Sequence, residues 1–549
     1  MLYREIFKIL GVFCLGFAAV LLIPLFLSIY YDYFADQLLY PQKHTTISFL
    51  ESIAACLAIG AGLLYLGKKA QGHIYRREGL AAVVLIWVLS PFLGGMPFYF
   101  NGALDNPWAS YFEATSALTT TGATAMQAKA YDATGNEIPI TKTLPGVINT
   151  TYTFFGTITP VRNPANHAII RDGIEAVGKA LLFWRSFMQW LGGVGIVVLF
   201  IAILPALGAG GKVLYQTEVP GPVKDSFTPR IRETAIQLWK IYLFLTVLQT
   251  ISLMFTTPKM EWLDAITITF STLSTGGFSI RNDNIAFYES AAVDWIVVLF
   301  MILGSINFAL YFHSLRGKFY RLYEPEFIIY LCVLVVVCTI GVVQLAGTPI
   351  APLSGAAEGV YKIGSAIRYG VFQIVSAITS TGFSTADYDT WPYTIQVLML
   401  IVMFIGGMSG STAGGIKIIR HYMMFKTAQY KIEGLFRPET IRNFKVGNKE
   451  IDSSSTTILF TFFILCVFCS ILGTYLYVLN GETPETAIGL VACMVNNTGL
   501  AFRIAGPTDS CAFMNDFAFF ISSFLMLVGR LEFIAVFALF VPAFWKQNS

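Results

Sequence analysis

Long apolar segments recur from one end of this chain to the other, and they constrain its fold more than any other feature. Many are about 20 residues long, which is enough for a helix to cross a lipid bilayer. Only 13% of the residues are charged, against about 25% in soluble proteins. The first segment, Ile9–Ile29, is too long for a signal peptide and no small-residue cleavage site follows it. We therefore expect an all-α polytopic membrane protein that retains this first segment.

Lysine and arginine residues gather in alternate connections between the apolar segments. The clusters are Lys68, Lys69, Arg76 and Arg77; Lys212, Lys224, Arg230 and Arg232; Arg316, Lys318 and Arg321; and Lys417, Arg420, Lys426, Lys431, Arg437, Arg442, Lys445 and Lys449. Positively charged loops of membrane proteins face the cytoplasm, so we expect these loops and both termini there. Because the clusters alternate with spans, the pattern favours membrane topology over nucleic-acid binding.

Several classes of function lack their sequence motifs in this chain. No GxxxxGK[ST] or GxGxxG motif stands between a strand and a helix, which argues against an ATP-driven pump. The five histidines are scattered and form no HExxH motif, and no set of residues resembles a catalytic constellation. We therefore expect no enzymatic activity, no cofactor bound by this chain and no resident metal site.

A Thr-Gly pair follows each of four apolar segments that are too short to cross a bilayer. The pairs stand in "TTTGAT" (119–124), "STGGFS" (274–279), "STGFST" (380–385) and "NTGLAF" (497–502), after Trp108–Leu118, Trp262–Leu273, Ile367–Ile378 and Thr486–Val495. Each short segment lies between two long ones. The predicted unit is a span, a half-helix, a loop and a second span, and it occurs four times around one pore. A hairpin of two spans, at about residues 9–30 and 47–66, precedes the four units.

The position of these loops limits what they can do. Backbone outside a helix cannot face lipid, because each unpaired amide or carbonyl group there costs several kcal/mol. Loops at membrane depth must instead line a path for water or ions, and rings of carbonyl oxygens can replace the hydration shell of a cation. Glycine allows the φ values that such carbonyls need. Alternatively, these small residues pack helices together, but their fourfold recurrence favours an ion path.

A glycine-rich stretch, "GGMSGSTAGG" (406–415), interrupts the apolar run Ile395–Ile419. Each glycine would cost about 1 kcal/mol relative to alanine if the run were a continuous helix. We therefore expect a break in the span that gives a mobile loop inside the pore. The alternative is a tight seam between packed helices.

The last apolar segment, about Phe517–Phe544, carries Arg530 and Glu532 near its middle. An arginine at the bilayer centre costs roughly 2.5–3.5 kcal/mol on insertion scales, so Arg530 should face the protein interior and bind acceptors there. The carbonyl groups of the glycine-rich stretch are suitable acceptors. A contact between Arg530 and Glu532 within one helix is disfavoured, because residues two apart do not face each other. Lys417 either belongs to a gate formed by this loop or only anchors the topology of the chain.

Several stretches resemble the Trk/Ktr/HKT superfamily of potassium transporters over nearly the whole chain. They are "YFEATSALTTTGAT" (111–124), "FWRSFMQWLGGVGIVVL" (183–199), "PRIRETAIQLWKIY" (229–242), "STGGFS" (274–279), "GGMSGSTAGGIKIIR" (406–420) and "VGRLEF" (528–533). The additional N-terminal hairpin is typical of the bacterial Trk branch, whereas Ktr-type subunits lack it.

The resemblance implies a potassium filter and a gate in a pore built from one chain. The filter residues would be Thr120, Thr121, Gly122, Ser274, Thr275, Gly276, Ser380, Thr381, Gly382, Asn497, Thr498 and Gly499. The gate would comprise Gly406, Gly407, Gly410, Ser411, Thr412, Gly414, Gly415, Lys417, Arg530 and Glu532. In the superfamily a serine at the first filter glycine accompanies sodium transport. Gly122 therefore favours potassium, with a coupled symporter of K+ and H+ or Na+, or a sodium-permeable relative, as the alternatives.

The resemblance also implies partners and a location. It predicts a homodimer in the bacterial inner membrane and a cytosolic nucleotide-binding regulatory ring of the TrkA type. ATP or NADH would then bind only to that partner, while K+ is the transported ligand. The cytoplasmic linker, residues 426–453, either docks on this ring or lies at the lipid headgroups.

The expected organisation assigns residues 1–70 to the N-terminal hairpin and residues 71–207, 208–316, 317–425 and 454–549 to the four pore units. Within the first unit, residues 125–180 form a polar insert outside the cell. Its β-prone stretch "NTTYTFFGTIT" (149–159) predicts partial order. Whether the insert caps the pore or is a tolerated elaboration stays open.

Overall fold

The computed structural model describes residues 3–35, 44–72, 75–132, 135–144, 149–163, 168–195, 231–353, 359–436, 445–446, 449–450 and 453–546. The predicted basic cluster of Lys212, Lys224 and Arg230 lies outside the described residues, as do Arg437 and Arg442. Most of the predicted linker 426–453 beyond Phe436 is also outside them.

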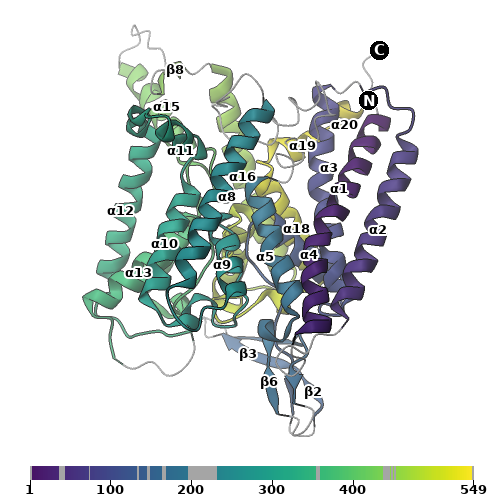
Figure 1. Ribbon diagram of the computed structural model, residues 1–549. Helices are drawn as coiled ribbons and strands as arrows, with labels where there is room; N and C mark the ends of the chain where they lie inside the picture. The colour runs from purple at the N-terminus through teal and green to yellow at the C-terminus, as the bar shows by residue number, and fades with distance from the viewer. Residues whose placement is uncertain are drawn as a thin grey trace.

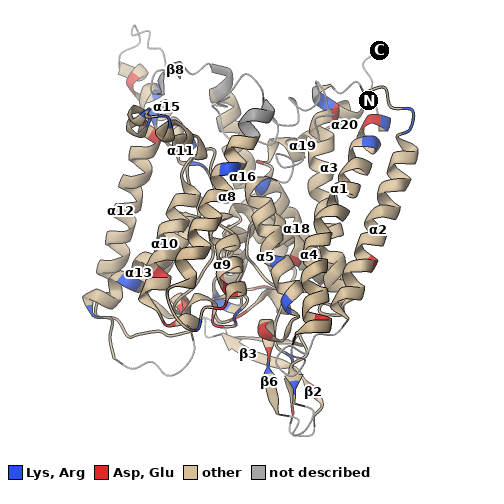
Figure 2. Ribbon diagram, viewed as in Figure 1, with Lys and Arg blue, Asp and Glu red and all other residues tan. Residues whose placement is uncertain are grey.

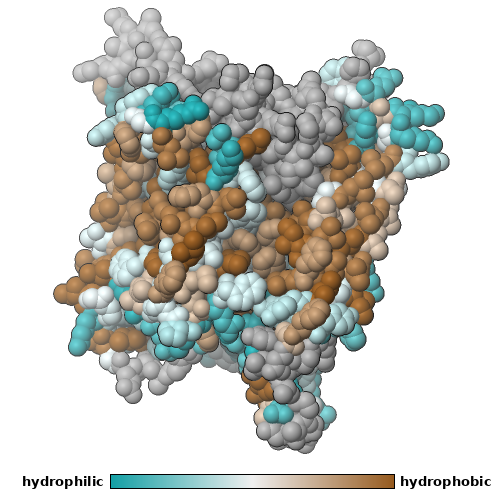
Figure 3. Space-filling model, viewed as in Figure 1, coloured by the Kyte–Doolittle hydropathy of each residue, from teal (hydrophilic) through white to brown (hydrophobic). Residues whose placement is uncertain are grey.

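Six helices in the described part of the chain are long and apolar enough to cross a membrane, or up to eight if each of two bent pairs is one span. The six are α1 (Tyr3–Ile29), α2 (Thr45–Leu66), α3 (Arg76–Phe100), α8 (Ile231–Met254), α12 (Pro325–Leu345) and α16 (Ser453–Leu479). Their axes run roughly between the same two ends of the molecule, with both termini at one end (Figure 1). Apolar residues form a belt across the middle of the visible face (Figure 3). The chain is a mainly helical, multi-pass protein.

The four predicted half-helices are present, each preceded by a longer helix. They are α4 (Pro107–Leu118), α9 (Trp262–Leu273), α13 (Ile363–Ile378) and α17 (Pro484–Asn496). Their 12 to 16 residues give lengths of only about 18–24 Å at 1.5 Å per residue. Local sequence fixes two of their starts, because Asn106 and Thr483 cap the first turns of α4 and α17, and a proline follows each cap. All four end where a Thr-Gly loop begins.

The helices that follow the half-helices end near the middle of the protein. They are α5 (Lys179–Val194), α10 (Ala291–Ser305), α14 (Tyr393–Phe404) and α18 (Asp516–Arg530), while α11 (Phe308–Leu315), α15 (Ile418–Phe436), α19 (Ile534–Phe540) and α20 (Pro542–Trp545) continue the chain. The bends are 90° between α10 and α11 and 118° between α18 and α19. The expected break in Ile395–Ile419 is present between α14 and α15.

The expectation of one continuous final span, Phe517–Phe544, is wrong. The helix stops at Arg530, and Glu532 and Phe533 have φ values of 61° and 59°, which no α-helix accepts. Glu532 forms an ion pair with Arg420 of α15 at 2.5 Å. Because this contact comes from a distant part of the chain, the apolar sequence of the segment gave no sign of the break.

The insert after the first loop forms short antiparallel hairpins, which confirms its expected partial order. Its strands are β1 (Ala130–Tyr131), β2 (Glu137–Ile138), β3 (Ile140–Leu144), β4 (Thr150–Phe154), β5 (Val161–Arg162) and β6 (Ile169–Arg171). The insert protrudes at the end opposite the termini (Figure 1). Tyr152 and Phe154 pack on the ring of Phe513, so the insert is attached to the last quarter of the chain.

Short elements complete the described chain. They are the π-helix η1 (Tyr30–Phe34), the 3-10 helices η2 (Gly173–Ala176), η4 (Asn284–Tyr288), η5 (Phe319–Tyr323), η6 (Tyr388–Thr390), η7 (Arg503–Ala505) and η8 (Cys511–Phe513), and the hairpin of β7 (Lys445–Val446) and β8 (Lys449–Glu450).

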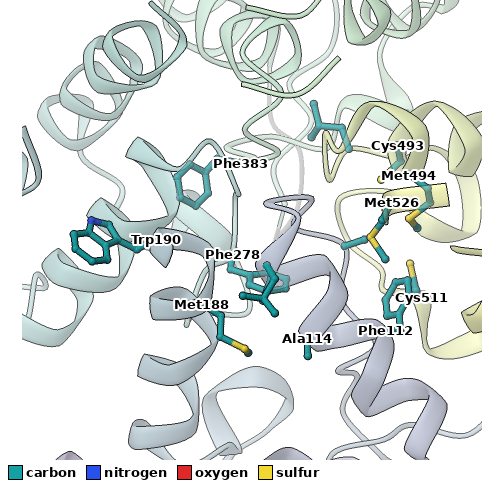
Figure 4. Packing of buried hydrophobic residues seen from close by; sticks show 14 of the residues in the cluster. Phe112, Ala114, Met188, Trp190, Phe278, Phe383, Cys493, Met494, Cys511 and Met526 are labelled. Atoms are coloured by element: carbon teal, nitrogen blue, oxygen red, sulfur yellow. The ribbon is translucent and has the colours of Figure 1, made fainter. Parts of the chain in front are cut away.

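The main hydrophobic core surrounds the ends of the half-helices. Phe278 and Phe383, each directly after the last glycine of its loop, are 1% and 0% exposed. They belong to the same buried cluster as Cys493 of α17 and Met526 of α18 (Figure 4). Tight packing of this kind holds the neighbouring loop backbone in one conformation.

Candidate functional site

The four loops share one unusual backbone conformation. In each, one non-glycine residue has a left-handed φ: 57° at Thr120, 55° at Thr275, 53° at Ser380 and 51° at Asn497. The amide of the next residue donates to the carbonyl five residues earlier, over 2.8 Å, 2.7 Å, 2.9 Å and 3.0 Å respectively. This is the hydrogen bond that closes a Schellman-type helix end, where glycine is the usual left-handed residue. The side chains at these positions accept strain of about 1–2 kcal/mol each, and such strain accumulates at functional sites.

This shared geometry corrects the expected alignment of the second loop. Matching the Thr-Gly pairs equates Ser274, Thr275 and Gly276 with Thr120, Thr121 and Gly122. The left-handed residue is Thr275, however, and the amide that donates five residues back belongs to Gly276. The equivalent stretch is therefore Thr275-Gly276-Gly277, one residue later. Two consecutive glycines made both alignments possible in the sequence.

The four loops contact one another in a closed ring. A methyl group added to Gly122 would lie less than 3.0 Å from the carbonyl oxygen of Gly276, and the same applies from Gly277 to Thr381, from Gly382 to Thr498, and from Gly499 to Thr121. Each glycine thus abuts the carbonyl at the equivalent position of the next loop, and the fourth loop returns to the first. The ring brings together residues that are more than 370 positions apart in the chain, as in the hydrogen bond from Asn497 Nδ2 to Thr121 Oγ1 at 2.9 Å.

The glycine-rich stretch lies directly against this ring. The amide of Gly414 donates to Ser380 Oγ over 2.5 Å, and the amide of Gly415 donates to the Asn496 carbonyl over 2.9 Å. Thr412 Oγ1 donates to the carbonyls of Leu273 and Gly304 over 2.8 and 2.9 Å.

Other predicted gate residues hold the shape of this stretch. Gly406 donates its amide to Ile416, the Gly410 carbonyl accepts from Phe308, and Ser411 Oγ donates to Met408. Gly407 packs closely against Ser305 and Ala413. The stretch is therefore a pinned loop rather than a helical seam between packed helices.

Arg530 joins the ring to the glycine-rich stretch. Its guanidinium donates to Thr120 Oγ1 at 3.1 Å, to the Thr412 carbonyl at 3.3 Å and to the Gly192 carbonyl at 2.5 Å. These contacts agree with the expectation that Arg530 binds carbonyl groups of the stretch. Glu532 instead pairs with Arg420, and buried Lys417 donates to the Ala413 carbonyl.

A cavity of about 170 Å³ opens beside these residues. Its lining includes residues 409–417, Asn496 and Asn497 at the start of the fourth loop, and Arg420, Arg530 and Glu532. The cavity therefore borders both the glycine-rich stretch and the fourth loop.

Buried ion pairs brace the other side of the ring, and the sequence reasoning missed their arginines. Arg185 of α5 donates to Glu113 of α4 over 2.6 Å and to the Ser279 carbonyl over 2.9 Å, with the ring of Phe278 against its guanidinium. Arg281 pairs with Asp264 of α9 over 2.8 Å. Arg185 stands in a polar gap of an otherwise apolar helix, which is the only sequence signal it gave.

We expect Arg185→Ala to destabilise the protein by roughly 3–5 kcal/mol, because it leaves the fully buried Glu113 carboxylate without its partner. The matched control is Lys259→Ala, which breaks an exposed pair with Glu289 and should cost at most about 1 kcal/mol. Chemical unfolding of the two purified variants in detergent measures the difference. Equal effects would contradict a bracing role for Arg185.

Acidic residues gather on the outer side of the third and fourth loops. Burial raises the pKa of the Asp387 carboxyl. The hydrogen bond from the Asp389 amide and the charge of Lys142 of β3 lower this pKa, whereas the negative charges of Asp389 and Asp509 raise it. Lys142 contacts Asp509 directly, and Arg503 lies 3.9 Å from Asp389. The insert therefore contributes a positive charge to this group, in addition to that of Arg503.

Comparisons with known proteins agree on one family. The family model described as "TrkH: Cation transport protein" matches residues 164–547. The chain is 31% identical to the Trk system potassium uptake protein TrkH of Escherichia coli K12, over 99% of this chain and 100% of that protein. It is 30% identical to the Vibrio parahaemolyticus protein of the same name, over 100% of both. The crystal structure of the potassium transporter TrkH from Vibrio parahaemolyticus superposes with a TM-score of 0.77 at 27% identity, covering 100% of both chains.

Proposed function

Because the chain belongs to the TrkH family of cation transport proteins, we propose that it takes up potassium ions through a channel-like pore. The selectivity filter of this pore is the ring made by residues 120–122, 275–277, 380–382 and 497–499. Ions move down their electrochemical gradient, and the four equivalent loops exchange the hydration shell of K+ for backbone carbonyls.

The closed ring of glycine–carbonyl contacts carries this proposal. Four helices end at the ring, so their negative C-terminal ends favour a cation there. The left-handed residues and the packed glycines fix the backbone of each loop, which keeps the carbonyl positions constant between ions. Side chains alone would not give the same spacing of oxygen atoms in all four loops.

The glycine-rich stretch 406–415 acts as the gate in this proposal. Its bonds to Ser380, to Asn496 and to Arg530 support a closed position against the filter. Its glycines at positions 410 and 415 have φ values of 75° and 68°, so the backbone can rearrange at points where other residues would resist.

We propose that this gate is regulated by a cytosolic partner and not by a ligand that binds to this chain. The predicted partner is a nucleotide-binding ring of the TrkA type, which would bind ATP or NADH. The end that carries both termini and the basic residues near α11 and α15 would face the cytoplasm (Figure 2). Two copies of the chain would form a homodimer in the bacterial inner membrane, with one pore in each.

Flux into proteoliposomes that contain this chain alone tests the function, with K+, Rb+ and Na+ compared in the absence of any proton gradient. We expect uptake of K+ and Rb+ to exceed that of Na+. Gly122→Ser should remove the preference, because the added side chain would meet the Gly276 carbonyl and Gly122 has a φ of 91°. Gly102→Ser is the matched control, since Gly102 also has a positive φ but only Asp105 lies near it.

A coupled symporter remains the second candidate, and the same measurement separates it. Coupling needs an ionisable group that binds and releases the co-transported ion. Glu113 and Asp264 are the acidic residues of the half-helices nearest the ring, and each is held by an arginine. Flux that appears only with a proton or sodium gradient would support the symporter and contradict the channel-like pore.

A further inference from the structure

We propose that Gln189 of α5 is a positioning residue of the potassium filter, and that its side chain replaces a threonine that the second loop lacks. This inference rests on the proposed function of the four-loop ring. It concerns how that ring, which has one loop unlike the others, keeps four equivalent carbonyl positions.

The second loop differs from the other three at one position. Residues Thr121, Thr381 and Thr498 precede the ring glycine in three loops, whereas Gly276 stands there in the second. Two consecutive glycines give this loop more backbone freedom than the others have. Thr121 and Thr381 also bond to threonines two residues earlier, over 2.9 and 2.8 Å. The second loop cannot form this bond.

The amide of Gln189 occupies the space that the missing side chain would fill. A methyl group added to Gly276 would lie 2.5 to 2.7 Å from three atoms of the Gln189 carboxamide. The φ of Gly276 is not in the left-handed region, so its backbone would accept another residue. The neighbouring glutamine, and not the backbone, is what requires glycine here.

Gln189 also bonds the loop on both sides of Gly277. Its Nε2 donates to the Gly276 carbonyl over 2.6 Å, and its Oε1 accepts from the Phe278 amide over 3.2 Å. The side chain is fully buried, so water does not compete for these bonds. The carboxamide therefore fixes the Gly276-Gly277 backbone from outside the loop.

Other helices place a methionine where α5 places Gln189. Gly192, Gly304 and Gly529 are equivalent, because each faces the carbonyl of the last apolar residue of its own half-helix, at Leu118, Leu273 and Val495. Three residues earlier stand Gln189, Met301 and Met526, all with 0% exposure.

One of these methionines is joined to a filter threonine through an asparagine. Asn497 Nδ2 donates to both Thr121 Oγ1 and the Met526 carbonyl. At the first loop, Met526 and Thr121 thus share a hydrogen-bond donor. At the second loop, Gln189 bonds to Gly276 directly.

Three variants test this pairing through the K+/Na+ uptake ratio in proteoliposomes. Gln189→Met should lower the ratio by about tenfold, because two ordinary hydrogen bonds that position the loop are lost. Gly276→Thr alone should lower it as well, because its side chain collides with the glutamine. The double variant Gln189→Met/Gly276→Thr reproduces the pairing of the first loop and should recover most of the ratio.

The control is Gln249→Met on α8, which also removes a fully buried carboxamide, one with no hydrogen-bond partner among the described residues. Its ratio should equal that of the unmodified protein. An unchanged ratio in Gln189→Met, or a double variant no better than the single ones, would overturn the inference.

The experiment distinguishes failure of the proposed function from failure of the inference about Gln189. If the unmodified protein does not prefer K+, the proposed function fails, and the variants are not needed to show it. If Gln189→Met does not assemble, Gln189→Glu keeps the shape and the acceptor for Phe278 but loses the donor to Gly276. The ratio should then fall too, and an unchanged ratio would contradict the role of that donor.

Discussion

Gly277→Ala is expected to reduce selective potassium uptake to background, whereas Gly276→Ala should retain a measurable part of it. Gly277 has a φ of 75°, and a methyl group there would lie less than 3.0 Å from the Thr381 carbonyl oxygen. That oxygen belongs to the backbone of the next filter loop and cannot rotate away. The strain of about 1–2 kcal/mol for a left-handed alanine adds to this collision. The three atoms nearest to a methyl group on Gly276 all belong to the Gln189 side chain, which can move more readily than backbone.

Gly347→Ala is the matched control for backbone strain. Gly347 has a φ of 83°, and no atom lies within 4 Å of the position of an added methyl group. Its uptake of K+ and Rb+ in proteoliposomes should match that of the unmodified protein. If Gly276→Ala were the more damaging of the two filter variants, the alignment based on Thr-Gly pairs would be correct and the one given by the structure would not.

The sequence was sufficient to predict the four half-helices, because their length and apolar character are local properties. Trp262–Leu273 was expected and found with the same bounds. The alignment of the second loop was not predictable, since "STGGFS" contains two glycines and the choice between them depends on which one meets the next loop. Gln189 could not be assigned either, because its partners Gly276 and Phe278 lie almost ninety positions away.

The break after Arg530 shows the same limit. Residues 531–533 are Leu, Glu and Phe, none of which normally ends a helix, and Gly529 precedes the break without a positive φ. The helix ends there because Arg420 draws Glu532 towards α15 and the Arg530 side chain reaches the Thr412 and Gly192 carbonyls. The polar residues Arg530 and Glu532 in an apolar segment indicated a position in the protein interior. The contacts that they make with distant residues determine where the helix ends.

Arg530→Ala is expected to raise the resting potassium flux of the chain alone by roughly 10- to 100-fold. A hydrogen bond to a charged group contributes about 1.5–3 kcal/mol, and this guanidinium holds the Thr412 carbonyl of the proposed gate while it contacts Thr120 of the filter. Arg530→Lys should give a smaller increase, because one ammonium group keeps the charge but cannot reach three separated acceptors. The measurement is 86Rb+ or K+ uptake without any regulatory partner.

Arg420→Ala separates the loss of these bonds from the loss of positive charge beside the pore. Arg420 lines the same cavity as Arg530 but pairs with Glu532 and forms no described bond with residues 405–416. If removing charge alone admits cations, Arg420→Ala should raise the flux as much as Arg530→Ala does. We expect the increase only at Arg530, because an open path requires residues 406–415 to leave the ring, and the Arg530 guanidinium is the group that joins their Thr412 carbonyl to Thr120 of the filter.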